Sequence, residues 1–456
     1  MKAPRYRTLI LFLLPVVLAA CAAYHPRPLP GTPGLSAQVP RLSVEAQSLK
    51  VPGIRPHPFD PSDGLDMTEV AMLAVANNPR LKAARANAGI GRAQVFAAGL
   101  LPDPELSFGL EHPTGGAPGL VNAMSLALNY PLQPLVGRGA ARHGAAARLR
   151  QIDLEVVWQE WQVAQQARIM YVRLLRQGRQ LELLREFQRT LKGRYESVRR
   201  SLRSGNMTAG PGTSVLSALA GIDTRLNEVE RAGIRTREAL AGLLGLDPEV
   251  ELLLADCTPG GTMDAGEIDN SLTTLAQRRP DLLALRAGYE SEDARLRKAV
   301  LEQFPGLSFG VSRARDTDGI NTVGIGVTLR LPFLNGNRGS IAVEEATREQ
   351  LRSAYQARLA EAHTGVHQLR SEMRLLEGQL RQARSRLSEL GEVASRAALA
   401  LDEGNLDIPA YVTIETGLMD RRIKFIRLEG SLQEVRIVLE TLLGMPVDDL
   451  TAGGKE

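Results

Sequence analysis

One set of sequence signals occurs twice in this chain, about 200 residues apart. The tetrapeptide Leu-Ser-Phe-Gly begins at Leu106 and again at Leu307, and a Gly-Asn pair begins at Gly205 and again at Gly404. This spacing is far longer than the roughly 20 to 50 residues of solenoid repeats. The sequence therefore predicts one structural unit that is duplicated, and it argues against a stacked array of small repeats.

The N-terminus has the layout of a secretory signal peptide. Basic residues precede an apolar run from Leu9 to Ala20, which is shorter than the roughly 20 residues that cross a bilayer. Leu18-Ala19-Ala20-Cys21 resembles a bacterial lipoprotein box, so we expect a mature protein that begins at Cys21 and carries lipid there, palmitate included. Ala22 stands where an Asp would indicate inner-membrane retention, which implies the outer membrane. The alternative is an ordinary signal peptide with an incidental cysteine.

Composition and motifs argue against several classes of function. The chain has 55 basic and 51 acidic residues, so its net charge of +4 gives no argument for nucleic-acid binding. Cys257 is the only cysteine besides Cys21, which leaves no disulfide framework and no Cys-x-x-Cys metal site. The sequence has no phosphate-binding loop, no Gly-x-Ser-x-Gly motif and no His-Glu-x-x-His motif. We therefore predict neither an enzyme nor a cofactor site.

A pair of histidines is the candidate for metal binding. His363 and His367 are four residues apart, so they share one face of a predicted helix and could bind a transition metal if they lined a lumen. Thr364 and Gly365 between them supply no third ligand. The alternative of two packed or solvated helix residues is favoured, and no metal site is predicted.

Composition and the repeat together divide the chain into six segments. Nine prolines between residues 22 and 64 are typical of an extended tether. The predicted segments are a signal peptide at 1–20, a lipidated cysteine and tether at 21–64, a first repeat at 65–250, a linker at 251–266, a second repeat at 267–445 and a tail at 446–456.

Each repeat is predicted to open with a helix and two short strands. Asp66 to Glu69 has the pattern of a capping box, which begins a helix to about Ala98, and the partner helix runs from Ser271 to about Gln303. Segments with alternating apolar and polar residues follow at 106–110 and 125–130, and again at 307–311 and 323–331. Alternation does not distinguish a sheet whose apolar face is a core from one whose apolar face meets lipid.

A very long helix follows the strands in each repeat. Residues 138–204 and 338–403 contain no proline, and each helix would be roughly 100 Å long. Apolar residues from Leu359 to Leu401 recur in alternating steps of three and four. This seven-residue rhythm requires a partner helix in left-handed coiled-coil packing. Shorter returning helices are predicted near 213–244 and 408–443.

Gly-Asn turns and charged residues mark the tips of the two predicted helical hairpins. Gly205-Asn206 and Gly404-Asn405 end the long helices, because glycine permits the left-handed conformation of a helix stop. The first tip is basic, with Arg199, Arg200 and Arg203, and the second is acidic, with Asp402, Glu403 and Asp407. We expect these charges to attract one another between neighbouring hairpins and to form a candidate gate. The alternative is that they are solvated helix ends.

Four strands per chain cannot close a membrane barrel, since the smallest barrels need about eight. Residues 66–445 resemble the TolC family of outer-membrane efflux proteins, specifically its lipoprotein members. The duplicated order of elements, the strand ends Tyr130-Pro131-Leu132 and Leu331-Pro332-Phe333, and the Gly-Asn tips carry this resemblance. It implies a mainly α fold with a small β part. A long, coiled-coil-like helical tunnel would lie in the periplasm, and the four strands would join the transmembrane β-barrel of a homotrimer.

The resemblance also implies partners and a function. The Gly-Asn tips would dock a periplasmic adaptor, which connects the tunnel to an energy-supplying inner-membrane pump of the resistance-nodulation-division type. The channel would be the passive exit duct of a tripartite efflux system for small molecules or metal ions. Two alternatives stay open: a type I protein-secretion outlet, and a non-conducting periplasmic coiled-coil lipoprotein, which would leave the strands unexplained.

Overall fold

The computed structural model describes residues 24–42, 51–52, 58–115, 119–206, 208–256 and 265–444. It separates into two units, residues 1–35 and residues 36–456. In the first unit, the described residues 24–35 form neither helix nor strand. All elements discussed below belong to the second unit. The predicted lipidation site Cys21 and the predicted tail at 446–456 lie outside the described residues.

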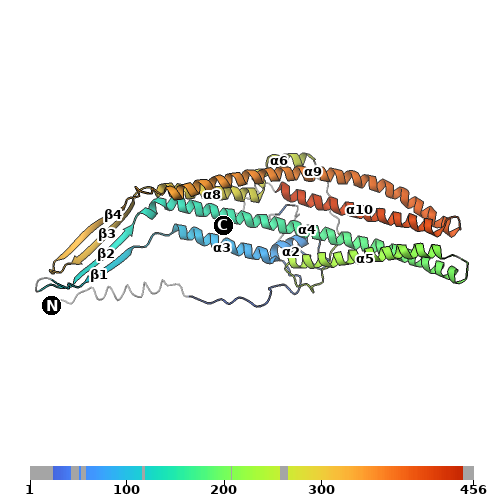
Figure 1. The fold of residues 1–456 in the computed structure, drawn as a ribbon, viewed down its shortest axis with the longest axis horizontal. Coiled ribbons are helices and arrows are strands. Elements are labelled where there is room, and N and C mark those ends of the chain that lie inside the picture. Colours follow the sequence, from blue (N-terminus) through green and yellow to red (C-terminus); the bar gives the residue numbers. More distant parts are fainter. Residues whose placement is uncertain are drawn as a thin grey trace. The chain divides into compact units, whose positions relative to one another are not determined.

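The second unit contains the duplicated architecture (Figure 1). The first repeat consists of α2 (Met67–Asn77), α3 (Pro79–Gly99), β1 (Glu105–Glu111), β2 (Ala123–Pro131), α4 (Gln133–Arg203) and α5 (Ala209–Leu243). The second consists of α6 (Ala265–Thr273), α7 (Leu275–Arg278), α8 (Pro280–Leu301), β3 (Gly306–Arg315), β4 (Asn321–Arg330), α9 (Arg338–Asp402) and α10 (Ile408–Leu443). The predicted mainly α fold with a small β part is confirmed.

The first helix of each repeat differs from the prediction because it is broken before a proline. The predicted helix at 66–98 is two helices, and Asn78 ends α2 while its side chain accepts hydrogen bonds from the first-turn amides of α3. The predicted helix at 271–303 is broken in the same way before Pro280. Proline cannot donate the helical hydrogen bond and disfavours α geometry in the residue before it. The predicted capping box is confirmed, since Asp66 and Glu69 each accept the other's backbone amide.

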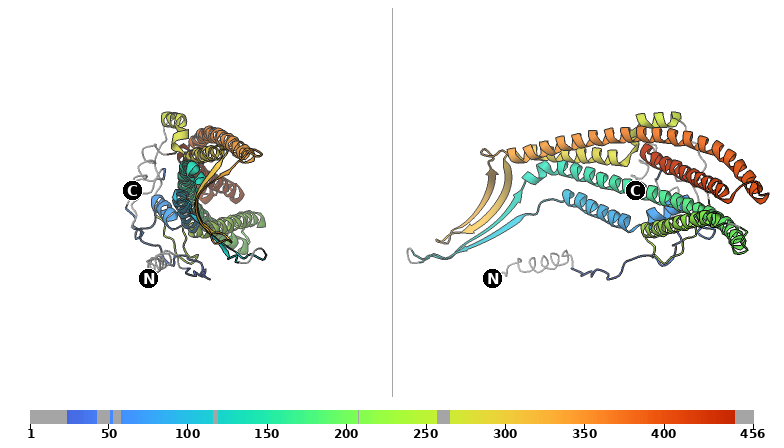
Figure 2. Two further views of the ribbon diagram at one scale, coloured as in Figure 1. Left: turned by 90° about the vertical axis from the view of Figure 1, so that its left-hand side faces the viewer. Right: turned by 45° about the vertical axis from the view of Figure 1, so that its right-hand side comes forward.

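The four strands form one antiparallel sheet in the order β1-β2-β3-β4. β1 pairs with β2 and β3 pairs with β4 within the repeats, while β2 pairs with β3 across the repeat boundary. The strands lead into helices that lie side by side, with α4 in contact with α3 and α8, and α8 in contact with α9. Two further views show the sheet beyond one end of these helices and the two hairpin tips at the other end (Figure 2).

The helices pack through apolar clusters that follow the predicted rhythm. Near the tips, α4, α5, α9 and α10 share one core that includes Leu184, Phe187, Ile222 and Tyr411. Farther along α9, buried residues pack against α10, where Val366 meets the cluster containing Leu439. The predicted partner for the seven-residue repeat of α9 is therefore confirmed as α10. Within the described residues, no helix is both long enough and apolar enough to cross a membrane.

Part of the predicted tether packs against the helical unit. Ser36 forms a short parallel bridge with Leu246, with backbone hydrogen bonds of 3.0 Å to Gly245 and from Asp247. Val39 and Phe59 pack against the same apolar cluster. This segment is therefore attached to the end of α5 by backbone pairing and by side-chain burial.

Candidate functional site

The sheet has two chemically different faces. One face carries apolar side chains in register across all four strands, as in the row of Leu106, Leu128, Val311 and Ile325. These side chains are between 37% and 83% exposed, although they are large and apolar. They are Leu106, Phe108, Leu110, Met124, Leu126, Leu128, Leu307, Phe309, Val311, Val323, Ile325, Val327 and Leu329. No described helix or strand covers this face, so it is exposed in a single chain.

The other face of the sheet is small and polar. The neighbouring row consists of Ser107, Ala127, Ser312 and Gly324, as the alternation of strand residues requires. Within the described residues, the outer edges of β1 and β4 pair with no further strand. An open edge presents unpaired backbone donors and acceptors that favour pairing with another chain. Both edges of the sheet are therefore open in the described part of a single chain.

The two hairpin tips have the helix stops that the sequence predicts. Gly205 has a φ of +75° and Gly404 a φ of +78°, a region that strongly favours glycine. Asn206 donates its backbone amide to Ser201 O, and Asn405 donates its amide to Ala400 O. These bonds are the six-to-one bonds of a Schellman motif, which satisfies carbonyls at the helix end.

An ion pair joins the two hairpins of one chain near the tips. Arg194 Nη1 on α4 donates to Asp402 Oδ1 on α9 at 2.6 Å, and the guanidinium lies 5.3 Å from the centre of the buried Tyr411 ring. The hydrogen bond from Arg194 lowers the pKa of Asp402, and burial raises the pKa of Tyr411. Asp402 is a predicted gate residue, whereas Arg194 and Tyr411 are not. Arg194 is eleven residues before Gly205, whereas Asp402 is two residues before Gly404. The two hairpins are therefore offset along their axes where this pair forms, and no pattern in the sequence indicates that offset.

The other predicted gate residues have local contacts. Arg199 lies 3.9 Å from Glu196 on its own helix, and Glu403 accepts a hydrogen bond from Asn405. Asp407 is the N-cap of α10 and accepts the amide of Ala410 at 2.8 Å. Arg203 makes no ion pair with any residue in the described part of the chain. Their role between neighbouring chains stays a prediction.

The two histidines are exposed on α9, with ring centres 4.7 Å apart. In the described ranges, no group of three or more His, Cys, Asp or Glu side chains could hold a metal ion. Among the described residues, no third carboxylate, thiol or imidazole lies near enough to complete a metal site with His363 and His367.

Residues 272–445, nearly all of the second repeat, match the family described as outer membrane efflux protein. The predicted resemblance to outer-membrane efflux proteins is confirmed over these residues. Comparison with curated protein sequences gives no match. The outer membrane efflux protein family consists of transport channels and is not a family of enzymes.

Solved structures share the fold over both repeats. The outer membrane protein VceC from Vibrio cholerae has a TM-score of 0.69 at 16% identity and covers 84% of this chain and 96% of its own. The CmeC outer membrane channel from Campylobacter jejuni has a TM-score of 0.71 at 16% identity, covering 83% and 85%. A membrane protein from Pseudomonas aeruginosa has a TM-score of 0.71 at 18% identity, covering 94% and 98%. At these identities the likeness shows the fold, and the outer membrane efflux protein fold therefore extends beyond residues 272–445.

Proposed function

We propose that this protein is the outer-membrane exit duct of a tripartite efflux system. The sheet carries the proposal, because it has one exposed apolar face, one polar face and two open edges in a single chain. Three copies would supply twelve strands and close the edges on one another. The apolar faces would then meet lipid and the polar faces would line a water-filled lumen.

The helices extend this proposed duct into the periplasm. The wall of α3, α4, α8 and α9 continues from the sheet, and the α4–α5 and α9–α10 hairpins end at the Gly-Asn tips. We assign adaptor docking to Gly205, Asn206, Gly404 and Asn405, whose Schellman turns present a short rigid surface. An inner-membrane pump of the resistance-nodulation-division type would supply the energy. The cargo would be small molecules or metal ions.

Conductance of the purified protein in planar bilayers tests the proposal. We expect discrete channel openings from an assembly with three times the mass of one mature chain. A protein that forms no trimer and conducts no ions would be the structural lipoprotein of the alternative hypothesis. Secretion of a protein substrate, with no efflux of small solutes in reconstituted vesicles, would favour the type I outlet.

A further inference from the structure

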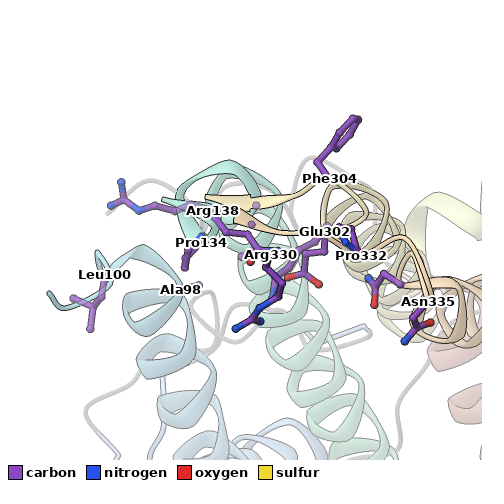
Figure 3. Close-up of a pocket in the computed structure, with 15 residues that line it drawn as sticks. Ala98, Leu100, Pro134, Arg138, Glu302, Phe304, Arg330, Pro332 and Asn335 are labelled. Atoms are coloured by element: carbon purple, nitrogen blue, oxygen red, sulfur yellow. The ribbon is translucent and has the colours of Figure 1, made fainter. Parts of the chain in front are cut away.

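A cavity of about 680 Å³ lies where the helices meet the sheet (Figure 3). It is lined by the first turns of α4, the end of α8, the end of β4 and the loop that precedes α9. Arg138, Arg330 and Glu302 are among its labelled side chains in Figure 3. This junction pocket is separate from the hairpin tips, which lie at the far ends of α4 and α9.

Strand register places the junction pocket on the polar face of the sheet. Arg330 is the register partner of Gly306, and both line the pocket. Their strand neighbours Leu329 and Leu307 point to the opposite, apolar face. A Cβ at Gly306 would clash with Gln133 Oε1, so the absence of a side chain there gives Gln133 its room in the pocket.

Basic groups dominate the charge of the junction pocket. Arg138, Lys298 and Arg330 line it with one carboxylate, Glu302, which leaves a net charge of +2. Lys298 Nζ lies 3.6 Å from Glu302, and Arg138 Nε donates to Gly99 O at 3.1 Å. Arg330 forms no ion pair with any residue that the structure describes. Its guanidinium is therefore available to a passing solute.

Helix geometry adds to this positive potential. α4 and α9 both begin at the junction pocket, and neither N-cap residue, Leu132 or Asn337, makes a side-chain capping bond. The N-terminus of a long helix carries about half a positive charge. Glu105 is the nearest carboxylate on the polar face of β1, and it aligns across the strands with Gly310. Gly310 is four residues from Gly306, or about 13 Å along the strand.

We propose that the junction pocket is an anion site on the export path, which selects solutes bearing a carboxylate, sulfate or phosphate group. The proposal rests on the proposed function, because the polar face lines a lumen only in the assembled channel. Rings of Arg and Lys side chains give pores a preference for anions. Three chains would place three such pockets around the path at the entrance to the sheet.

The test compares reversal potentials of single channels across a KCl gradient. Arg330→Gln and Lys298→Gln should each shift the permeability ratio toward K⁺ about two- to threefold, as expected for removing one charge at about 7 Å in water. Glu302→Gln should shift the ratio toward Cl⁻. The matched control is Arg313→Gln, because Arg313 lies on the apolar face beside Leu126 and Val323 and should leave the ratio unchanged. All shifts should shrink in 1 M salt, where the Debye length falls to about 3 Å.

The outcomes separate the two proposals. Conducting channels whose selectivity is the same in wild type, Arg330→Gln and Glu302→Gln would overturn the anion site and leave the exit duct intact. An equal shift in Arg313→Gln would also overturn the site, because the effect would then be one of net charge. If Arg330→Gln fails to assemble, Glu302→Gln still tests the anion site, since it should shift the permeability ratio in the opposite direction, toward Cl⁻. A wild-type protein that does not conduct would overturn the duct itself.

Discussion

At the scale of single residues, Glu292 on α8 has a strongly perturbed environment. Its side chain is buried, with Arg295 Nη1 on the same helix 3.5 Å from Oε2. Burial and the neighbouring Glu344 carboxyl on α9 raise the pKa of Glu292 to about 7. The two residues are 52 positions apart, so no periodicity in the sequence indicates that their carboxyl groups meet.

Glu292→Gln should change how thermal stability depends on pH. Below about pH 4.5, Glu292 is protonated in both the folded and the unfolded chain. As the pH rises to about 7, the unfolded chain loses this proton while the folded chain keeps it, so wild-type stability falls across that range and is level above it. Glutamine cannot ionise and avoids this loss. The Tm of Glu292→Gln minus the Tm of wild type should therefore be about 2–4 °C larger at pH 8 than at pH 5.

Scanning calorimetry or intrinsic fluorescence at pH 5, 6, 7 and 8 measures this difference. Glu345→Gln is the matched control, because Glu345 is an exposed neighbour of Glu344 on α9. A Tm difference that is constant from pH 5 to pH 8 would show that Glu292 does not titrate in this range.

At the scale of elements, the ion pair between Arg194 and Asp402 holds two hairpins together. Arg194→Glu or Asp402→Arg should raise channel conductance, and the two changes together should restore part of the closed state. One exposed pair contributes only about 0–1 kcal/mol, but three copies would act on the same equilibrium. The expected increase in open probability is about two- to tenfold for a single variant.

Single-channel recording measures this open probability. Arg189→Glu is the control, since Arg189 donates to Arg185 O on its own helix and makes no ion pair within the described residues. Arg203→Glu tests a contact between neighbouring chains separately, and Asp407→Arg is less informative because it also removes the cap of α10. Unchanged gating in Arg194→Glu and Asp402→Arg would show that this ion pair does not hold the channel closed, and would leave Asp402 as a solvated helix end.

The two faces of the sheet should respond differently to charge. Val327→Arg should impair membrane assembly, because a charge facing the middle of a bilayer costs about 2–4 kcal/mol. Thr328→Arg, on the adjacent position and the polar face, should assemble normally. Leu126→Arg should impair assembly less than Val327→Arg, since Arg313 already lies beside Leu126 on this face. Trimer yield in outer-membrane fractions measures assembly, and equal yields for Val327→Arg and Thr328→Arg would indicate a soluble sheet.

Elements were predictable from sequence where a local rule determines them. The capping box at Asp66, the proline-free helices and the Gly-Asn tips are local signals, and each lies where the sequence indicates. The breaks before Pro79 and Pro280 were missed because the apolar pattern continues across them. The junction pocket and the Arg194 contact depend on how elements from both repeats meet, which no local pattern records.

At the scale of the whole molecule, the predicted lipid anchor at Cys21 can be tested separately from the channel. Cys21→Ala should abolish labelling with radioactive palmitate and cleavage after Ala20, while the helical unit should still fold. The mature protein's mass and labelling measure this. A variant with wild-type mass and wild-type labelling would remove Cys21 as the site of modification.

The bridge between Ser36 and Leu246 limits how far such a lipid could reach. Ser36 is 15 positions after Cys21, and a fully extended chain of that length spans roughly 50 Å. Leu246 packs in the same cluster as Tyr171, and the helix from Gln133 to Tyr171 is about 57 Å long. A segment fixed at that height would be fully extended before Cys21 came level with the start of α4. The length of the N-terminal segment would then limit how far below the membrane surface each subunit could stand.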